Sequence, residues 1–307
     1  MGLKKKIITM KIAWVFPGQG SQKLGMGKDV INLYGAKRKF DYASNEFDKD
    51  LYKICEDDSP DSLDFDLNNT KNTQICLFLV ESILLDHLKE NGYKPDFLAG
   101  HSLGEITAFY ASGVLTFENA VSLIKVRSEL MANAAEGSMA ALMGFDRAEL
   151  YKVIEKTDDV VIANDNSSSQ VVLSGTKKAL ESISKELKCK RFINLNVSGA
   201  FHSHLMKEPS QKFSEYLNLL NFNKPIIPVI SNSNPSFSLD PIVLKSNFKQ
   251  QMCNGVRWRE TMDLMAKDVT NLHFVEIGPS NVLGGLAKRH LKDVKISQVS
   301  SSDNIGY

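Results

Sequence analysis

Ser102 is the first residue whose setting suggests chemistry, because it lies between two glycines in the sequence GHSLG at residues 100–104. Pro95 ends the helical pattern before it, residues 97–99 read as a short buried strand, and residues 105–112 read as a helix. A strand, a tight turn and a helix in this order are typical of a nucleophile elbow, which exposes a serine hydroxyl above a helix N-terminus. The pattern predicts a nucleophilic serine, and a plain strand-to-helix turn is the alternative.

A serine nucleophile needs a proton acceptor that titrates near neutral pH, and histidine is the usual one. Of the 6 histidines, only His101 and His202 lie in turns flanked by glycine. The sharp turn directs the side chain of His101 away from Ser102, so His202 is the expected general base. Two alternatives stay open for His202, namely a structural role or metal binding together with His204. We expect no metal, because no third ligand lies nearby in the sequence.

A second glycine-rich turn, FPGQGSQ at residues 16–22, follows a strand predicted at residues 11–16. Glycines on both sides of Gln19 let the backbone turn sharply and approach another group closely. It is no phosphate-binding P-loop, because no Lys-Ser or Lys-Thr pair follows at the required spacing. The turn either simply ends the strand or supplies the Gln19 N–H to an oxyanion hole, whose second N–H would come from Leu103.

The helix predicted to follow Thr116 carries Arg127 on its apolar face. That face also includes Ala120, Leu123, Ile124 and Met131. A guanidinium among core-facing residues is costly unless an anion meets it. Three interpretations stay open for Arg127: it snorkels at the edge of the apolar face, it pairs with an internal carboxylate such as Glu105, or it waits for a substrate carboxylate that its planar fork would grip.

An α/β fold is expected to position these residues, with a large α/β-hydrolase-like subdomain around a parallel sheet at residues 11–135 and 200–300. The helical run at residues 75–89 should pack beside the elbow. From Gly137 the pattern changes to strands at 139–145, 160–164, 170–174 and 191–197, with helices at 147–156 and 177–187. The order β-α-β-β-α-β is ferredoxin-like, so residues 136–199 are expected to form a small inserted subdomain.

The composition of the 307 residues, 43% hydrophobic and 24% charged, is ordinary for a globular protein with a substantial core. Lys and Arg (37) nearly balance Asp and Glu (36), which argues against nucleic acid or membrane partners. The four cysteines lie far apart without a CxxC pair, as expected for reduced thiols in a cytoplasmic protein. The apolar run at residues 75–88 is too short to cross a bilayer. Residues 1–10 lack the hydrophobic length of a signal peptide, and we interpret them as a leader before the first strand.

Five motifs follow one another along the chain: FPGQGSQ at 16–22, GHSLGE at 100–105, Arg127, VSGAFHS at 197–203 and EIGP at 276–279. In this combination the chain, from residue 12 to about residue 296, resembles the malonyl-CoA:acyl-carrier-protein transacylases and the acyltransferase domains of polyketide synthases. The resemblance implies a ping-pong reaction. A serine takes a malonyl group from coenzyme A and then gives it to the phosphopantetheine thiol of an acyl carrier protein.

The resemblance also implies a role for each matching position. Ser102 would be the nucleophile, His202 the base and Arg127 the ligand of the malonyl carboxylate. The oxyanion-hole N–H groups would come from Gln19 and Leu103. In place of an acidic third member, a main-chain carbonyl would orient the histidine, and the matching position is Gln251.

Phe201 bears on the choice of acyl group. In similar acyltransferases an aromatic residue just before the histidine goes with malonyl and a small residue with methylmalonyl. Discrimination of one methyl group is worth only about 1–3 kcal/mol, so we expect a preference and not an exclusion. Met131 and His101 are expected to bind substrate beside Phe201. Two positions depart mildly from the family, namely Asn281 where lysine is common and Gly255 where proline is common.

The resemblance implies no permanently bound cofactor. Malonyl-CoA enters as substrate, a phosphopantetheinylated acyl carrier protein is the partner, and a monomer is expected. A free-standing chain favours a transacylase of fatty acid biosynthesis over a trans-acting polyketide acyltransferase. A serine hydrolase or thioesterase would share the elbow and the base but would not need Arg127, and a carrier-docking module without activity would need none of the three residues. Basic residues at 185–191 or 288–289 are candidates for docking an acidic carrier protein, unless they are ordinary solvated surface.

Overall fold

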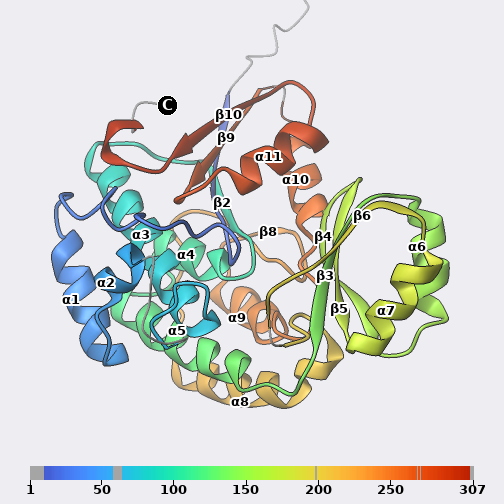
Figure 1. Ribbon diagram of the computed structural model, residues 1–307. Helices are drawn as coiled ribbons and strands as arrows, with labels where there is room; N and C mark the ends of the chain where they lie inside the picture. The colour runs from blue at the N-terminus through green and yellow to red at the C-terminus, as the bar shows by residue number, and fades with distance from the viewer. Residues whose placement is uncertain (1–9, 58–63, 198, 268, 270, 305–307) are drawn as a thin grey trace, which may run out of the picture.

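The computed structural model describes residues 10–57, 64–197, 199–267, 269 and 271–304, and its larger layer is a six-stranded sheet (Figure 1). The strands are β1 (Lys11–Phe16), β2 (Phe97–Gly100), β7 (Val229–Ile230), β8 (Phe237–Ser238), β9 (Leu272–Ile277) and β10 (Val294–Val299). They lie in the order β10-β9-β1-β2-β7-β8, and every neighbouring pair is parallel except β7 and β8. The predicted parallel sheet is confirmed, with an antiparallel strand at one edge.

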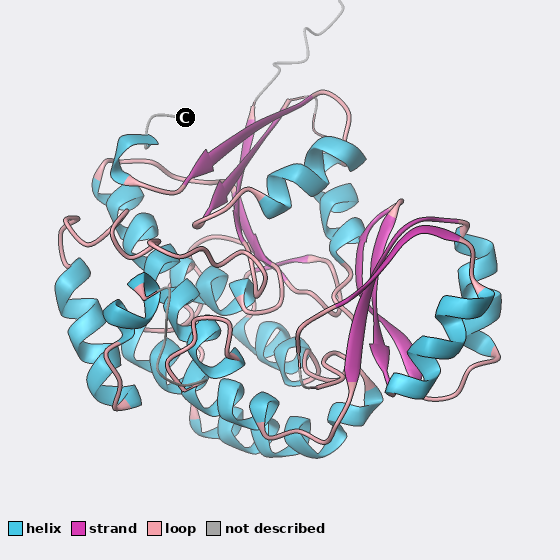
Figure 2. Cartoon of the chain, viewed as in Figure 1, coloured by secondary structure: helices cyan, strands magenta, loops and turns pink. Residues whose placement is uncertain are grey.

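Helices cover both faces of this sheet, as expected for parallel strands (Figure 2). One face packs against α1 (Ala36–Phe47), α2 (Leu51–Glu56), α3 (Thr70–Glu90), α4 (Gly104–Ala111), α5 (Phe117–Ala132), α8 (Lys207–Leu219) and α9 (Pro241–Lys249). The other face packs against α10 (Trp258–Ala266) and α11 (Val282–His290). Side chains of β1 alternate between the two faces, so both faces are apolar and need cover. Trp14 and Phe16 pack into the core on the first face, and Ala13 and Val15 pack into the core on the second.

Helix α3 is the longest helix among the described residues, with 21 residues that are buried on almost every side. It begins at Thr70, earlier than the predicted residue 75, because the Asn69 side chain caps it by accepting a hydrogen bond from the Lys71 N–H. The same first turn brings Gln74 into the core at 1% exposure. The earlier start of α3 thus brings a polar side chain into the core just before the predicted apolar run.

The second layer is a four-stranded antiparallel sheet made of β3 (Ser138–Phe145), β4 (Val160–Ser167), β5 (Gln170–Gly175) and β6 (Cys189–Asn194), in the order β4-β5-β3-β6. Helices α6 (Arg147–Glu155) and α7 (Lys177–Glu186) cover one face of it. The predicted β-α-β-β-α-β order is confirmed. The last strand ends at Asn194 and not at residue 197, because its ladder with β3 stops at the Ala140–Asn194 pair and the chain then turns toward the serine.

The two layers meet along β4, whose regular pairing with β5 is interrupted near Asn164. There β4 pairs with the segment before α10 instead. The Val256 N–H donates to the Ala163 carbonyl at 2.7 Å, and the Asp165 N–H donates to the Val256 carbonyl at 2.9 Å. Gly255 permits this approach, because a Cβ atom there would lie 2.7 Å from the Ile162 carbonyl oxygen. The departure from the family at this position therefore falls on the contact between the layers.

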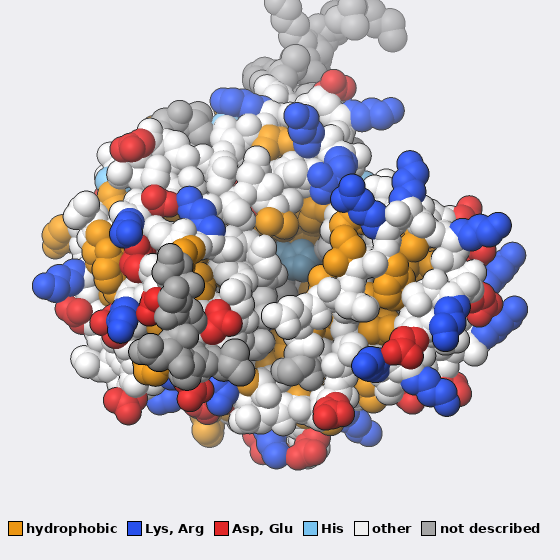
Figure 3. Space-filling view, viewed as in Figure 1, with side chains coloured by type: hydrophobic (Ala, Val, Ile, Leu, Met, Phe, Trp, Pro, Cys, Tyr) orange, Lys and Arg blue, Asp and Glu red, His pale blue; other side chains and the backbone are white. Residues whose placement is uncertain are grey.

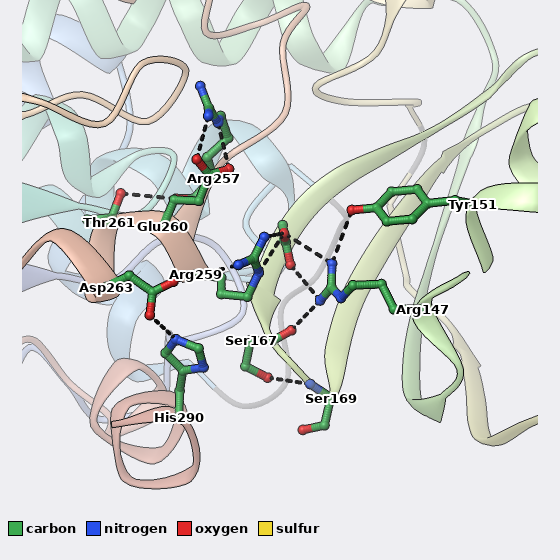
Figure 4. A network of polar contacts seen from close by, with 11 residues as sticks. Arg147, Tyr151, Ser167, Ser169, Arg257, Arg259, Glu260, Thr261, Asp263 and His290 are labelled. Atoms are coloured by element: carbon green, nitrogen blue, oxygen red, sulfur yellow. Dashed lines mark hydrogen bonds and ion pairs between the residues drawn. The ribbon is translucent and has the colours of Figure 1, made fainter. Parts of the chain in front are cut away.

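Side chains reinforce the same contact through Asp165, whose arginine partners Arg147 and Arg259 are labelled in Figure 4. Its carboxylate accepts hydrogen bonds from Arg147 Nη2 at 2.9 Å and from Arg259 Nε at 3.0 Å, so one arginine comes from each layer. Arg259 also pairs with Asp263, and Asp263 pairs with His290 at 2.7 Å. A charged network therefore links α6 and β4 to α10 and α11.

Two predicted segments lie partly outside the described residues. The leader at residues 1–10 lies outside the described residues apart from Met10, as does Ser198 in the VSGAFHS motif. Within the described ranges, no helix combines the length and apolar character needed to cross a membrane.

Candidate active site

Ser102 lies on a sharp turn between β2 and α4, with φ of 53°. The residues two positions before and after it must be glycine. A Cβ on Gly100 would lie 1.9 Å from main-chain atoms of Gly104, and a Cβ on Gly104 would lie 2.0 Å from the Phe16 oxygen. Asn232, after β7, secures the turn by accepting from the Ser102 N–H at 2.7 Å. The predicted strand, turn and helix are confirmed, and the turn stores backbone strain at the serine.

His202 is 100 residues away from Ser102 in the sequence but lies beside it in the structure, with Nε2 at 2.8 Å from the serine Oγ. Its Nδ1 donates to the main-chain carbonyl of Gln251 at 2.8 Å. Because a carbonyl can only accept, the proton sits on Nδ1 and Nε2 is free to take the serine proton. Burial, helped by the charge of Arg127, lowers the pKa of His202 to about 3, so the ring is neutral at neutral pH.

Arg127 lies on α5 at 1% exposure and reaches the same point. Its Nη2 donates to Ser102 Oγ at 3.1 Å and to Gln251 Oε1 at 2.9 Å, and its Nη1 donates to Gln74 Oε1 at 2.6 Å. The Nε donor has no partner in the part of the chain that the structure describes. Burial lowers the pKa of Arg127 to about 10, which leaves it charged at neutral pH.

No carboxylate among the described residues forms an ion pair with this guanidinium. Two of the three interpretations of Arg127 are therefore wrong. The side chain does not snorkel to the surface, and it does not pair directly with Glu105. Neutral oxygen atoms hold a full positive charge beside the serine.

Gln19 and Leu103 lie on two turns that pack on each other. A Cβ on Gly18 would lie 2.5 Å from the His101 oxygen, so only glycine lets the first turn approach the elbow. Both residues line the pocket that holds Ser102. Across the described ranges, neither the Gln19 N–H nor the Leu103 N–H donates to another group of the protein. Both remain available to an oxygen atom in the pocket.

These side chains surround a pocket of about 80 Å³. It collects the predicted residues Gln19, His101, Ser102, Leu103, Arg127, Met131, Phe201 and His202. Gln251 lies behind this wall and contacts it through hydrogen bonds. Residues far apart in the sequence therefore converge on one small space, as the predicted chemistry requires.

A longer groove of about 760 Å³ adjoins the pocket and shares Gln19, His101 and Asn164 with it. Lys190 from β6 and Arg289 from α11 also line the groove. Figure 3 shows the corresponding hollow between the two layers, with hydrophobic side chains around it and lysine and arginine side chains along part of its rim. The path from the surface to the serine is thus apolar near the centre and cationic toward the outside.

His101 and His204 are not placed as bases. The ring of His101 lies against Trp258, and its Nε2 is 2.8 Å from Asn166 Oδ1 on β4. His204 is largely exposed and contacts Asp159. Within the ranges that the structure describes, no cluster of three or more His, Cys, Asp or Glu residues could hold a metal ion.

Sequence reasoning missed three polar residues of the site, namely Gln74, Asn164 and Asn232. Gln74 precedes Leu77 and Phe78 at helical spacing, so its place on a buried face was a readable signal. Asn164 lines the pocket, and its buried Oδ1 has no partner among the described residues. Asn232 had no local signal, because its role depends on contact with a turn 130 residues away.

The fold and the site together describe an α/β protein in which a serine hydroxyl, a neutral imidazole and a buried cation meet, an arrangement typical of enzymes with a serine nucleophile. The chain belongs to the family described as the acyl transferase domain, whose model matches residues 13–306. The resemblance found in the motifs is thereby confirmed.

This chain is similar to several transacylases along almost their whole lengths. The malonyl CoA-acyl carrier protein transacylase of Synechocystis sp. is 44% identical over 96% of this chain and 99% of its own. A crystal structure of the Synechocystis sp. enzyme superposes with a TM-score of 0.91 at 43% identity, covering 96% of this chain and 99% of that one. A malonyl-transacylase in complex with its holo type II polyketide synthase acyl-carrier protein has a TM-score of 0.89 at 31% identity, covering 96% and 97% of the two chains.

Proposed function

We propose that this protein transfers a malonyl group from malonyl-CoA to the phosphopantetheine thiol of an acyl carrier protein, through a malonyl ester of Ser102. The observation that carries the proposal is the 3.1 Å contact between Arg127 Nη2 and Ser102 Oγ. A buried, unneutralised cation beside the nucleophile favours an acyl group that ends in a carboxylate. The match to the Synechocystis transacylase over 99% of its length supports the same activity.

In the first half-reaction, Ser102 Oγ attacks the thioester carbonyl while its proton moves to His202 Nε2. The N–H groups of Gln19 and Leu103 stabilise the oxyanion that forms on the former carbonyl oxygen. The carbon–sulfur bond then breaks, and the proton on His202 goes to the departing coenzyme A thiolate. The Gln251 carbonyl keeps the imidazole in one orientation throughout these steps.

The second half-reaction reverses these roles. His202 takes the proton of the phosphopantetheine thiol, the thiolate attacks the malonyl ester, and the Ser102 oxygen leaves and regains the proton. Arg127 keeps the malonyl carboxylate in place between the two steps. This clamp favours thiol over water as the acceptor, because the ester is held in one position within a pocket of about 80 Å³.

The groove offers one path for both thiols, because coenzyme A and the carrier protein both present a phosphopantetheine arm. Its cationic residues Lys190 and Arg289 suit the phosphate that both arms carry. We assign the reaction to fatty acid biosynthesis. The relative in complex with a polyketide synthase carrier keeps carriers of that pathway as the alternative acceptor.

We propose further that no cofactor is permanently bound and that a monomer is the active unit. Four free cysteines support a cytoplasmic, reducing setting. We also propose that residues 136–199 are a small subdomain inserted into a large one at 11–135 and 200–300. The bridge between Glu136 and Gly199, which closes the inserted segment, supports this division.

The decisive experiment follows radiolabelled malonyl-CoA with and without phosphopantetheinylated carrier protein. The proposal predicts a stable malonyl-protein adduct without carrier and labelled carrier when carrier is added. Rapid release of free malonate in the absence of carrier would instead identify a hydrolase. Carriers of fatty acid and polyketide synthesis, compared at equal concentration, decide the pathway.

A further inference from the structure

Gln251 is hydrogen-bonded to His202, to Arg127 and to the main chain of Ser102. Its main-chain carbonyl accepts from His202 at 2.8 Å, and its side-chain Oε1 accepts from Arg127 Nη2 at 2.9 Å. Its Nε2 donates to the Ser102 carbonyl and to Glu105 Oε2, both at 2.8 Å. One amide therefore stands between a buried cation and a buried carboxyl group.

Glu105 follows the elbow in the first turn of α4 and is 1% exposed. Its Oε2 also accepts from the Asn232 N–H at 3.4 Å, and its Oε1 has no partner in the described part of the chain. The carboxyl group is too well buried to contact solvent and is not bonded to Arg127. The motif residue after GHSLG thus has a defined place behind the pocket, which the reaction steps above do not use.

The position of the Gln251 amide between Arg127 and Glu105 determines its orientation. Glu105 Oε2 accepts hydrogen bonds from Gln251 Nε2 and from the Asn232 N–H, so it holds the NH₂ group of Gln251 on its side and leaves Gln251 Oε1 facing Arg127. A direct contact between Glu105 and Arg127 would neutralise the guanidinium. The amide between them keeps Arg127 oriented beside Ser102 and leaves its charge available to a substrate.

We propose that Glu105, acting through Gln251, is a positioning residue that sets the preference of this enzyme for acyl groups bearing a carboxylate. This inference rests on the proposed function. If Glu105 loses its acceptor-only character, the Gln251 amide can rotate and turn its NH₂ group toward the guanidinium. Two donors would then face each other, and Arg127 would leave its place beside Ser102. Neutral acyl groups do not use that cation and would still load.

The test measures formation of acyl-Ser102 from malonyl-CoA and from acetyl-CoA, by mass spectrometry of the intact protein over time. Glu105→Gln keeps the size of the side chain and adds a donor. We expect it to lower the malonyl-to-acetyl ratio of loading rates about tenfold or more, in line with the loss of one hydrogen bond to a charged group. Acetyl loading should stay within about threefold of the unchanged protein.

Glu81→Gln is the matched control. Glu81 is also wholly buried, accepts from Thr107 and has one oxygen without a partner among the described residues, but it is not bonded to Gln251. It should leave the malonyl-to-acetyl ratio unchanged. Glu105→Asp retains an acceptor-only group and should restore part of the preference, which also covers the case in which Glu105→Gln fails to fold.

The inference is overturned if Glu105→Gln leaves the loading ratio unchanged, if both acyl groups lose rate equally, or if Glu105→Asp behaves no better than Glu105→Gln. The proposed function is tested separately by the unchanged protein. If that protein forms no malonyl-Ser102 at all, the activity itself is wrong, whatever the variants do.

Discussion

Arg127 Nη2 lies 3.1 Å from Ser102 Oγ, so the cation expected to bind the substrate touches the proposed nucleophile itself. A substrate carboxylate gripped by this guanidinium is tied to one distance from the attacking atom. In the proposed reaction, the same side chain would therefore select the acyl group and orient it for attack.

Replacing Arg127 by alanine should separate malonyl from acetyl chemistry. We expect Arg127→Ala to lower kcat/KM for malonyl transfer by about two to three orders of magnitude, because a charged carboxylate would lose its partner in a buried pocket. Acetyl transfer should be spared or raised. The comparison uses both acyl-CoA substrates with one carrier protein, and equal losses for the two would contradict the clamp.

Ser102→Ala should abolish the covalent intermediate. Intact-mass spectrometry after incubation with malonyl-CoA should show the addition of one malonyl group to the unchanged protein and none to the variant. Because alanine removes only the hydroxyl, the fold should persist, and circular dichroism checks this. An adduct that survives in Ser102→Ala would mean that another residue is the nucleophile.

The pH dependence of acyl loading should not show the titration of a histidine with its usual pKa. Since burial lowers the pKa of His202 to about 3, the neutral base is present well into the acidic range. Loading from acetyl-CoA should therefore stay nearly constant from about pH 8 to about pH 5, whereas an unperturbed imidazole would lose half its activity near pH 6.5. Acetyl-CoA is the probe because its loading does not need Arg127.

Burial is the main cause of that low pKa, and the same measurement on Arg127→Ala tests the further contribution of the Arg127 charge. The positive charge of Arg127 disfavours protonation of His202, so its removal should raise the pKa and move the acidic limb of the profile to higher pH. A wild-type limb near the ordinary histidine pKa, or a limb that does not move in the variant, would contradict this assignment.

Asp165→Asn should weaken the contact between the two layers. It leaves Arg147 and Arg259 without their shared carboxylate, whose side chain is only 13% exposed. We expect a loss of about 1–3 kcal/mol in the free energy of unfolding, measured by urea denaturation. The control is Asp263→Asn at the more exposed end of the same network, with an expected change within about 0.5 kcal/mol. Equal effects of the two variants would argue against Asp165 as the link.

Charge reversal around the groove should distinguish docking of the carrier from binding of the phosphopantetheine arm. Lys190 and Arg289 line the groove, whereas Lys185 and Lys288 are exposed and do not. We expect Lys190→Glu and Arg289→Glu to raise KM about tenfold for malonyl-CoA and carrier protein alike. Lys185→Glu and Lys288→Glu should raise KM for the acidic carrier only. Unchanged carrier saturation in the outer pair would remove Lys185 and Lys288 as docking residues for the carrier.

The chemistry of single residues was readable from the sequence because local rules impose it. Gly100 and Gly104 are required by close backbone contacts around Ser102, and that requirement leaves a recognisable spacing. The same holds for Gly18 beside Gln19, and for the helical spacing that put Arg127 on an apolar face. The order of strands and helices followed from periodicity in the same way.

What only the tertiary structure decided is how these residues are connected. Neither Asn232 under the elbow nor the Gln251 amide between Arg127 and Glu105 leaves a local pattern, since the partners lie more than a hundred residues away along the chain. The end of β6, the close approach at Gly255 and the pairing of Asp165 with two arginines depend likewise on the meeting of two layers. Short-range steric constraints act between residues close in the sequence, so the sequence shows them directly. Long-range hydrogen-bond partners and the burial that shifts a pKa exist only once distant segments have packed together.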